Sequence, residues 1–168
     1  MKPGPKKTAF PPIADRDCVL LILGTMPGER SIQLQQYYGH KSNQFWKIMF
    51  GLFGLPVPES YEARKQLLLD RHIALWDVLS HCEGQGSADH HIVNEVANDF
   101  VAFYKQYPGI KTVVFDSTHA EKFYLRHVGK SPDKTYLRVP SPSSAHAGKS
   151  LSQKTEEWRI ILEFLEKD

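Results

Sequence analysis

The chain is poor in cysteine, since only Cys18 and Cys82 occur among its 168 residues. Two thiols cannot build the disulfide framework of a small secreted domain, nor a four-cysteine metal or iron–sulfur site within one chain. The pairs His81-Cys82 and His90-His91 add possible ligands, but their spacing matches no common zinc motif. We therefore expect no metal and no cofactor.

Long hydrophobic runs are also missing. The apolar stretches fall far short of the roughly 20 residues that cross a bilayer. The segment Met1 to Lys7 is rich in lysine and proline and lacks the apolar stretch of a secretory signal. We expect a cytoplasmic protein with no membrane partner.

Excess charge of either sign is small. The formal net charge is +2, from 21 basic and 19 acidic residues, which does not by itself indicate a polyanionic partner. The distribution is uneven, because six basic residues between positions 126 and 154 face the single acid Asp133. This pattern predicts a locally basic face, either a solvated surface or a phosphate-binding one. The six are Arg126, Lys130, Lys134, Arg138, Lys149 and Lys154.

The hydrophobic content of 41% is typical of a globular domain with its own core. Residues 1–12 predict a flexible tail, and residues 13–168 a single domain. Buried strands alternate with helical patterns, which indicates the α/β class and a small central parallel sheet of four strands. The predicted strands are Val19–Leu23, Ile73–Val78, Thr112–Phe115 and Thr135–Val139.

Helix-start signals lie between these strands. We expect helices to begin near Asn43, Ser60 and Asn98 or Asp99, and the last near Thr155. A capping-box pattern at Thr118 predicts another helix, which Gly129 would end. The polar stretch after Val78 predicts a loop.

The most informative segment follows the first strand and runs from Gly24 to Trp46. Ligands of open α/β sheets bind outside the carboxyl ends of the strands, and Gly24 and Gly28 allow the backbone to turn sharply there. An ordinary strand-to-helix connection would explain the glycines. It would not explain the adjacent pair Tyr37 and Tyr38.

Two further loops leave the carboxyl ends of predicted strands, at Asp116-Ser117 and at Pro140–Gly148. In a parallel sheet all three loops converge on one edge. The hydroxyls and amides of the last loop, flanked by Arg138 and Lys149, suit a phosphate group. A plain surface turn is the alternative for that loop.

Together these residues resemble the uracil-DNA glycosylase superfamily, in particular its hypoxanthine-DNA (deoxyinosine) glycosylase branch, which is related to the G/T(U)-mismatch-specific glycosylases. The likeness extends over nearly the whole domain and includes Pro140-Ser141 of the second family motif. It implies a three-layer α/β/α sandwich. The matching residues of the first motif are Gly24, Thr25, Pro27, Gly28, Ser31, Tyr37, Tyr38, Gly39, His40, Asn43, Phe45 and Trp46.

The resemblance implies a monomeric DNA repair enzyme that flips a deaminated base out of DNA and hydrolyses its N-glycosidic bond. Deoxyinosine is the first substrate it suggests. No lysine lies inside the first motif to form a Schiff base, so we expect a monofunctional glycosylase.

Asn43 is the residue that the resemblance assigns to positioning the attacking water, because Met26 occupies the place where many relatives carry a polar residue for that task. Helix capping is the alternative role for Asn43. Tyr38 is the expected stacking platform for the base, although sequence alone does not separate it from Tyr37. Gly24, Thr25 and Met26 would contact the base through their backbone.

Asp116 stands where relatives carry an asparagine, and a carboxylate there can accept a base N–H but cannot donate. It would read the base edge or support the loop. We expect DNA contacts from the second loop and from His40, which has a loop-holding role as its alternative. The loop residues are Ser141, Ser143, Ser144, His146 and Lys149.

Val139 replaces a histidine that donates to the departing base in uracil-specific relatives, so weak uracil activity is expected. Uracil or G/T(U)-mismatch excision remains one alternative function. A catalytically silent DNA-binding member of the fold is another. A serine hydrolase using the loop from Ser141 to His146 is the weakest, because that loop has no Gly-x-Ser-x-Gly pattern.

Overall fold

A computed structural model of the chain describes residues 6–83, 92–144 and 148–165. Its central sheet has four parallel strands in the order β3-β2-β6-β7. This confirms the predicted sheet and its strands, with ends that differ by a residue or two. The bounds are β2 Leu20–Gly24, β3 Ile73–Asp77, β6 Thr112–Phe115 and β7 Thr135–Arg138.

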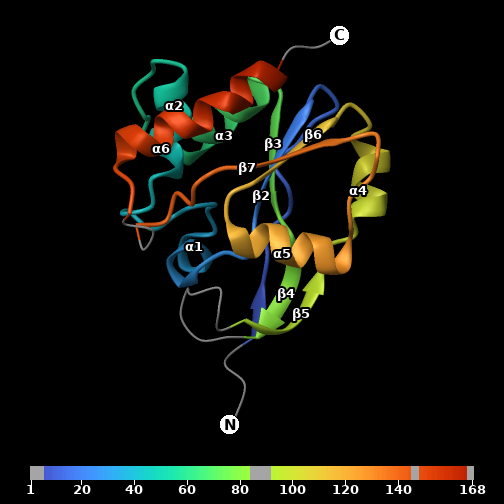
Figure 1. Ribbon diagram of the computed structural model, residues 1–168. Coiled ribbons are helices and arrows are strands. Elements are labelled where there is room, and N and C mark those ends of the chain that lie inside the picture. The colour runs from blue at the N-terminus through green and yellow to red at the C-terminus, as the bar shows by residue number, and fades with distance from the viewer. Residues whose placement is uncertain (1–5, 84–91, 145–147, 166–168) are drawn as a thin grey trace.

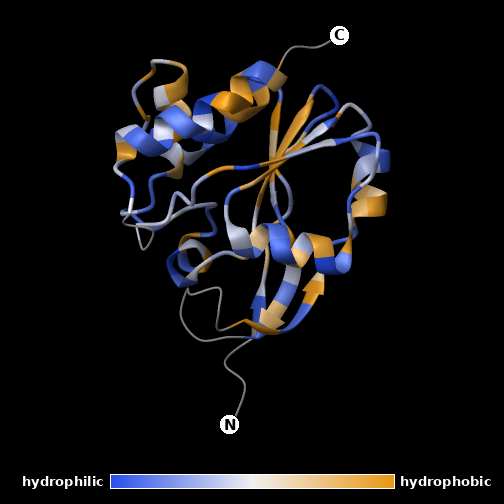
Figure 2. Cartoon of the chain, viewed as in Figure 1, coloured by the Kyte–Doolittle hydropathy of each residue, from blue (hydrophilic) through white to orange (hydrophobic). Residues whose placement is uncertain are grey.

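Each central strand supplies side chains to two hydrophobic cores, one on either face of the sheet. In β2, Leu20 and Ile22 belong to one core, whereas Leu21 and Leu23 belong to the other. Successive strand residues point to opposite faces, so a strand buried on both sides needs an unbroken apolar run. Figure 2 shows this hydrophobic colour along the crossing strands.

Helices cover both faces of the sheet, as Figure 1 shows. One layer packs on the core that contains Leu20, and the other on the core that contains Leu21. The three-layer α/β/α architecture is therefore confirmed. The first layer consists of α2 (Phe45–Leu52), α3 (Tyr61–Asp70) and α6 (Leu151–Trp158), and the second of α4 (Phe100–Gln106) and α5 (Thr118–His127).

The helices are short and begin at serine or acidic caps in several cases. Ser117 caps α5 through a bond from the Ala120 N–H, one residue before the predicted start, and Gly129 ends that helix at φ +82°. α6 begins earlier than predicted because Ser150 and Gln153 form a capping box; a 3-10 helix, Arg159–Phe164, continues it. In the described part of the chain, no helix is long and apolar enough to cross a membrane.

A second sheet lies beyond one end of the central one and was not predicted. It is antiparallel, in the order β1-β4-β5, with bounds Lys6–Thr8, Leu79–Glu83 and Val93–Ala97. The prediction of a loop directly after Val78 is therefore wrong for these residues. The reason is that β4 buries only Leu79 and Cys82 among polar neighbours, and β5 is largely exposed, so hydrophobicity carried little signal.

The predicted flexible tail over residues 1–12 is also wrong for its described part. β1 pairs with β4, and the Ala9 N–H extends the pairing by donating to the Ser80 carbonyl at 2.8 Å. The Phe10 carbonyl accepts from the Trp76 indole, and the Pro11 carbonyl accepts from the Tyr37 hydroxyl at 2.8 Å. Hydrogen bonds of its backbone fix this segment. A sequence rich in proline and lysine gives no sign of such bonds.

Candidate functional site

Three strand ends meet around Gly24, the last residue of β2. Gly24 pairs with Asp77 of β3, and Asp116 directly follows β6 on the other side. A Cβ atom built on Gly24 would lie 2.7 Å from Asp77 Oδ1 and 3.1 Å from Asp116 Oδ2. Both carboxylates are almost fully buried. The absence of a side chain at Gly24 is therefore what leaves room for two acidic groups.

Tyr38 reaches this cluster from the loop that follows β2. Its hydroxyl donates to Asp116 Oδ2 at 2.6 Å, a charge-assisted bond. Its ring stacks on Phe45, with the centroids 4.0 Å apart and the planes 13° from parallel. The backbone adopts φ +53°, an uncommon conformation for a tyrosine, and the two side-chain contacts hold it there.

Tyr37, its neighbour, has a different place. It is buried in the core, its hydroxyl donates to Pro11 and its own N–H donates to the Tyr61 hydroxyl at 2.9 Å. Tyr38 is only partly buried and packs on the outside of Phe45. Of the two tyrosines, only Tyr38 presents a ring at the sheet edge where the loops meet.

The Tyr38 hydroxyl is held in its neutral form. Burial raises its pKa well above the ordinary value of a tyrosine, and the negative charges of Asp116 and Asp77 raise it further. Tyr38 therefore donates its proton to Asp116 throughout the neutral range. A neutral ring next to two carboxylates also adds no further negative charge to the site.

Asn43 lies half-buried just before α2. Its Oδ1 accepts the Phe45 N–H at 2.9 Å, and its N–H donates to the His40 carbonyl at 2.9 Å. Asn43 thus satisfies the first N–H of α2 from the position before the N-cap, which is Gln44. An amide oxygen has two lone pairs, so Oδ1 retains capacity for a proton of a water molecule. Capping and water positioning are compatible roles for this side chain.

The second loop docks against the first. The Gln44 N–H donates to the Pro142 carbonyl at 2.8 Å, and the hydroxyls of Ser42 and Ser144 lie 2.9 Å apart. Within the second loop, the Ser143 N–H donates to Ser141 Oγ at 3.2 Å. The convergence expected from parallel strands is present, and it brings Ser143 and Ser144 beside Asn43.

His40 is exposed and helps to shape the first loop. Its Nδ1 accepts from the Ser42 N–H at 3.1 Å and lies 2.7 Å from the Ser42 hydroxyl. Because a backbone N–H can only donate, Nδ1 carries no proton and the neutral ring has its proton on Nε2. His40 therefore holds the loop and keeps an outward donor at the same time.

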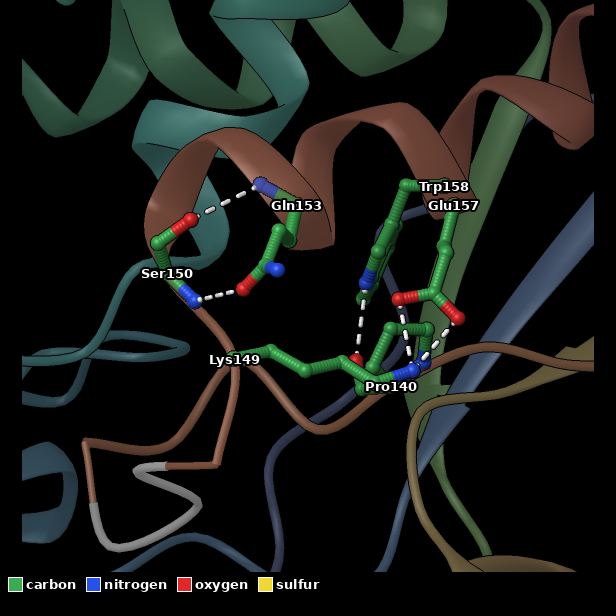
Figure 3. A network of polar contacts seen from close by, with 6 residues as sticks. All are labelled: Pro140, Lys149, Ser150, Gln153, Glu157 and Trp158. Atoms are coloured by element: carbon green, nitrogen blue, oxygen red, sulfur yellow. Dashed lines mark hydrogen bonds and ion pairs between the residues drawn. The ribbon is translucent and has the colours of Figure 1, made fainter.

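Three of the six cations of the expected basic face pair with acids. Lys149 pairs with Glu157 of α6, with 2.6 Å between Nζ and Oε2, next to the bond from the Trp158 indole to the Pro140 carbonyl (Figure 3). Arg126 pairs with Glu95, and Arg138 with Glu121. All three cations remain partly exposed, which is consistent with the solvated surface expected for this segment, and their acids lie outside positions 126 to 154.

Several other expected residues have clear places. Val139 is buried in the core. The carbonyls of Gly24 and Thr25 accept from the Val78 and Leu79 N–H groups, so these two oxygens face the β3–β4 turn. Met26 packs partly buried against the core under α4 and α5. His146 and the pair His90-His91 lie outside the described residues.

The His81-Cys82 pair does not form a common ligand site. The two residues are consecutive in β4, where Cys82 is buried and His81 is exposed. Side chains of consecutive strand residues point to opposite faces of the sheet. The two side chains therefore cannot hold one ion together.

Comparison with known proteins decides the family. The model of the family described as "Uracil DNA glycosylase superfamily" matches residues 11–165. The chain belongs to the uracil-DNA glycosylase superfamily. Two relatives named hypoxanthine DNA glycosylase are similar over almost their whole length. The Methanosarcina barkeri protein is 31% identical, covering 91% of this chain and 96% of its own; the Methanosarcina acetivorans protein is 32% identical, covering 92% and 97%.

A solved structure agrees with this membership. The solution NMR structure of a Methanosarcina acetivorans protein, named there as a candidate uracil DNA glycosylase, matches with a TM-score of 0.80 and 31% identity. The match covers 96% of this chain and 99% of that one. The fold of this superfamily member is therefore shared along its whole length with a relative.

Two residues of this glycosylase-family site were missed in the sequence. Asp77 is the last residue of β3 and the one acid in the predicted strand Ile73–Val78, and its place near the end of that strand was its only signal. Lys154 was counted as a surface cation, although its side chain is buried and bonded to Gln44 and Ser143. The positions of Asp77 and Lys154 become clear only from contacts between residues that are distant in the sequence.

Gly24→Ala tests the close approach at the strand ends. The added methyl would contact the Asp77 and Asp116 carboxylates and would lie 3.3 Å from the Tyr38 hydroxyl. We expect base excision to fall by about 10-fold or more, with a small change in the melting temperature, because displacement of reactive groups by about 1 Å is costly. Gly51→Ala, whose Cβ would meet only Thr155 at 3.7 Å, is the control. Equal activities of the two variants would contradict this account.

Glu157→Gln tests whether Lys149 is restrained in the free protein. We expect DNA to bind about 2- to 5-fold more tightly, with a salt dependence steeper by about one released counterion, since the ammonium gains access to a phosphate. Glu163→Gln is the matched control, because Glu163 is an exposed acid in the 3-10 helix that follows α6. An identical gain in both variants would mean that net charge alone, not the Lys149 pair, sets the affinity.

Proposed function

We propose that this protein is a monofunctional hypoxanthine-DNA (deoxyinosine) glycosylase acting in base excision repair. The observation that carries the proposal is the similarity to two hypoxanthine DNA glycosylases over more than nine-tenths of the chain. The geometry supports it, because Tyr38, Asn43 and Asp116 lie in loops that meet at one edge of the sheet.

The flipped base would stack on Tyr38. The face of this ring that packs on Phe45 is covered, so the base takes the opposite face. Aromatic stacking and a site reached only by an extruded nucleotide are the general solution for enzymes that act on a base. The raised pKa of Tyr38 keeps the ring neutral, and its hydroxyl fixes Asp116 at the edge of the base.

Asp116 would select the base by accepting its ring N–H. Hypoxanthine carries a proton on N1, whereas adenine has an unprotonated N1 with a lone pair that faces a carboxylate unfavourably. The Tyr38 bond uses one acceptor position of Asp116, and a carboxylate offers several. The Asp116 carboxylate would thus distinguish hypoxanthine from adenine.

Bond cleavage places positive charge on the sugar and negative charge on the leaving base. Asn43 Oδ1 would hold the attacking water through its remaining lone pair, in the role that Met26 cannot perform. The buried Asp77 carboxylate would favour the positive sugar electrostatically. Water attacks directly, and the product is an abasic site with no covalent enzyme intermediate.

The leaving base receives no help from a side chain at position 139, because Val139 is apolar and buried. The histidine that donates to departing uracil in uracil-specific relatives is therefore missing, and backbone amides or another side chain would have to stabilise a purine leaving group. We therefore propose that hypoxanthine is preferred over uracil. DNA phosphates would be held by His40, Ser141, Ser143, Ser144, His146 and Lys149.

A substrate panel tests the proposed function. Oligonucleotides containing hypoxanthine, uracil, xanthine or thymine, single-stranded and paired with each opposite base, are incubated with excess protein and treated with alkali to reveal abasic sites. We expect hypoxanthine to be released at least about 10-fold faster than uracil. Binding to these DNAs without release of any base would instead favour a catalytically silent member of the superfamily.

Asn43→Ala tests the assignment of the water-positioning residue. We expect the single-turnover rate on deoxyinosine DNA to fall by about 100-fold or more, with DNA affinity nearly unchanged, because the lost group acts on the transition state. Loss of the Phe45 capping bond alone would cost about 1 kcal/mol of stability, which thermal unfolding measures separately. Wild-type rates in this variant would remove Asn43 from the mechanism.

A further inference from the structure

Lys154 is a lysine in an unusual place. It lies on α6 with a relative exposure of 1%, among the largest fully buried side chains of the protein. Lysine is almost never fully buried unless its charge is paired, because removal of an ammonium group from water is costly. Such a residue therefore needs a reason for its place.

The ammonium group joins the two loops of the site. Nζ donates to the Gln44 side-chain oxygen at 2.9 Å and to the Ser143 carbonyl at 3.1 Å. Gln44 follows Asn43 directly, and Ser143 belongs to the second loop. These segments are about 100 residues apart in sequence, so one cation links motifs that only the fold brings together.

The partners of Lys154 are neutral. Within the described residues, no carboxylate lies within 4.0 Å of Nζ, and burial lowers its pKa from the ordinary lysine value. Carbonyl and amide oxygens thus compensate a charge that a surface lysine would leave in water. The Lys154 ammonium group loses its hydration, and its hydrogen bonds hold the two loops in a fixed geometry.

A second contact makes this geometry relevant to Asn43. The Gln44 N–H donates to the Pro142 carbonyl, so the backbone of Gln44 bonds directly to the second loop, whereas its side chain is joined to that loop only through Lys154. Gln44 is the N-cap of α2, yet its side chain makes no capping bond. Its amide is therefore engaged with Lys154 rather than with its own helix.

We propose that Lys154 is a positioning residue of the glycosylase reaction, which fixes Asn43 through Gln44 and the second loop through the Ser143 carbonyl. The inference rests on the proposed function, because it assigns Lys154 to the reaction that Asn43 carries. Lys154 itself does not touch the reacting atoms. It holds the loop that contains Asn43 and the loop that contains Ser143 in a fixed position relative to each other.

Lys154→Met tests the inference with a side chain of similar length and no hydrogen bonds. We expect the single-turnover rate on deoxyinosine DNA to fall by about 10- to 100-fold, while the dissociation constant for duplex DNA changes by less than about 3-fold. Lys105→Met is the matched control, because Lys105 is exposed on α4 in the opposite helix layer. An unchanged rate in Lys154→Met would overturn the inference.

Gln44→Met supplies a second variant that leaves the lysine in place. We expect a similar loss of rate, and the double variant should lose little more, because both substitutions break one contact. Melting temperatures of all variants are measured in parallel. Independent, fully additive losses of rate would overturn the coupling through Gln44, as would a loss of stability without any loss of rate.

Borohydride trapping separates positioning from covalent chemistry. If Lys154 attacked the sugar, reduction would leave a covalent protein–DNA adduct that disappears in Lys154→Met, and the inference would be wrong. We expect no adduct. Wild-type protein serves as the reference for the proposed function itself: if it releases no base at all, that function fails, whereas an active wild type with an equally active Lys154→Met refutes only the role of Lys154.

Discussion

The parallel register of β2 with its two neighbours is the constraint on which the site depends. It places Gly24 opposite Asp77 and Leu23 opposite Phe115, so that Asp116 follows at the same edge. A slip of one residue in either pairing would exchange the core face of every side chain and bury the wrong groups. The two apolar cores therefore fix the positions of two buried acidic groups.

The loops beyond this edge gain their shape from contacts with other elements. Tyr38 adopts a positive φ because its ring rests on Phe45 and its hydroxyl on Asp116, and the next residue, Gly39, donates its N–H to Ser31 Oγ at 2.9 Å. A charge-assisted hydrogen bond of about 1.5–3 kcal/mol is comparable to the cost of such a backbone conformation. The rigid sheet thus determines the geometry of a loop that has little regular structure.

The sequence predicted the central sheet because strands buried on both faces have unbroken apolar runs, and the motif from Gly24 to Trp46 pointed to the loops that meet at its edge. It failed where hydrophobicity was weak, as in β5, and where partners are remote. Lys154 looked like a surface cation because its acceptor Gln44 lies 110 positions away. Likewise, the acids that pair with Lys149 and Arg138 lie outside the basic segment, so a count of charges within that segment misses them. Polar contacts between distant residues have no periodicity, so sequence patterns do not predict them.

The proposal that Asn43, and not a side chain in the turn of Met26, positions the water has a structural consequence. A side chain in the turn after β2 would be positioned by the sheet itself, whereas Asn43 lies almost twenty residues further on, beyond a loop. Its position then depends on the contact between the two loops, through the Ser42–Ser144 hydroxyl pair and the Gln44 bond to Pro142. The catalytic role that we propose for Asn43 requires such a dense set of cross-loop bonds, because a freely moving loop would spend most of its time away from the reactive geometry.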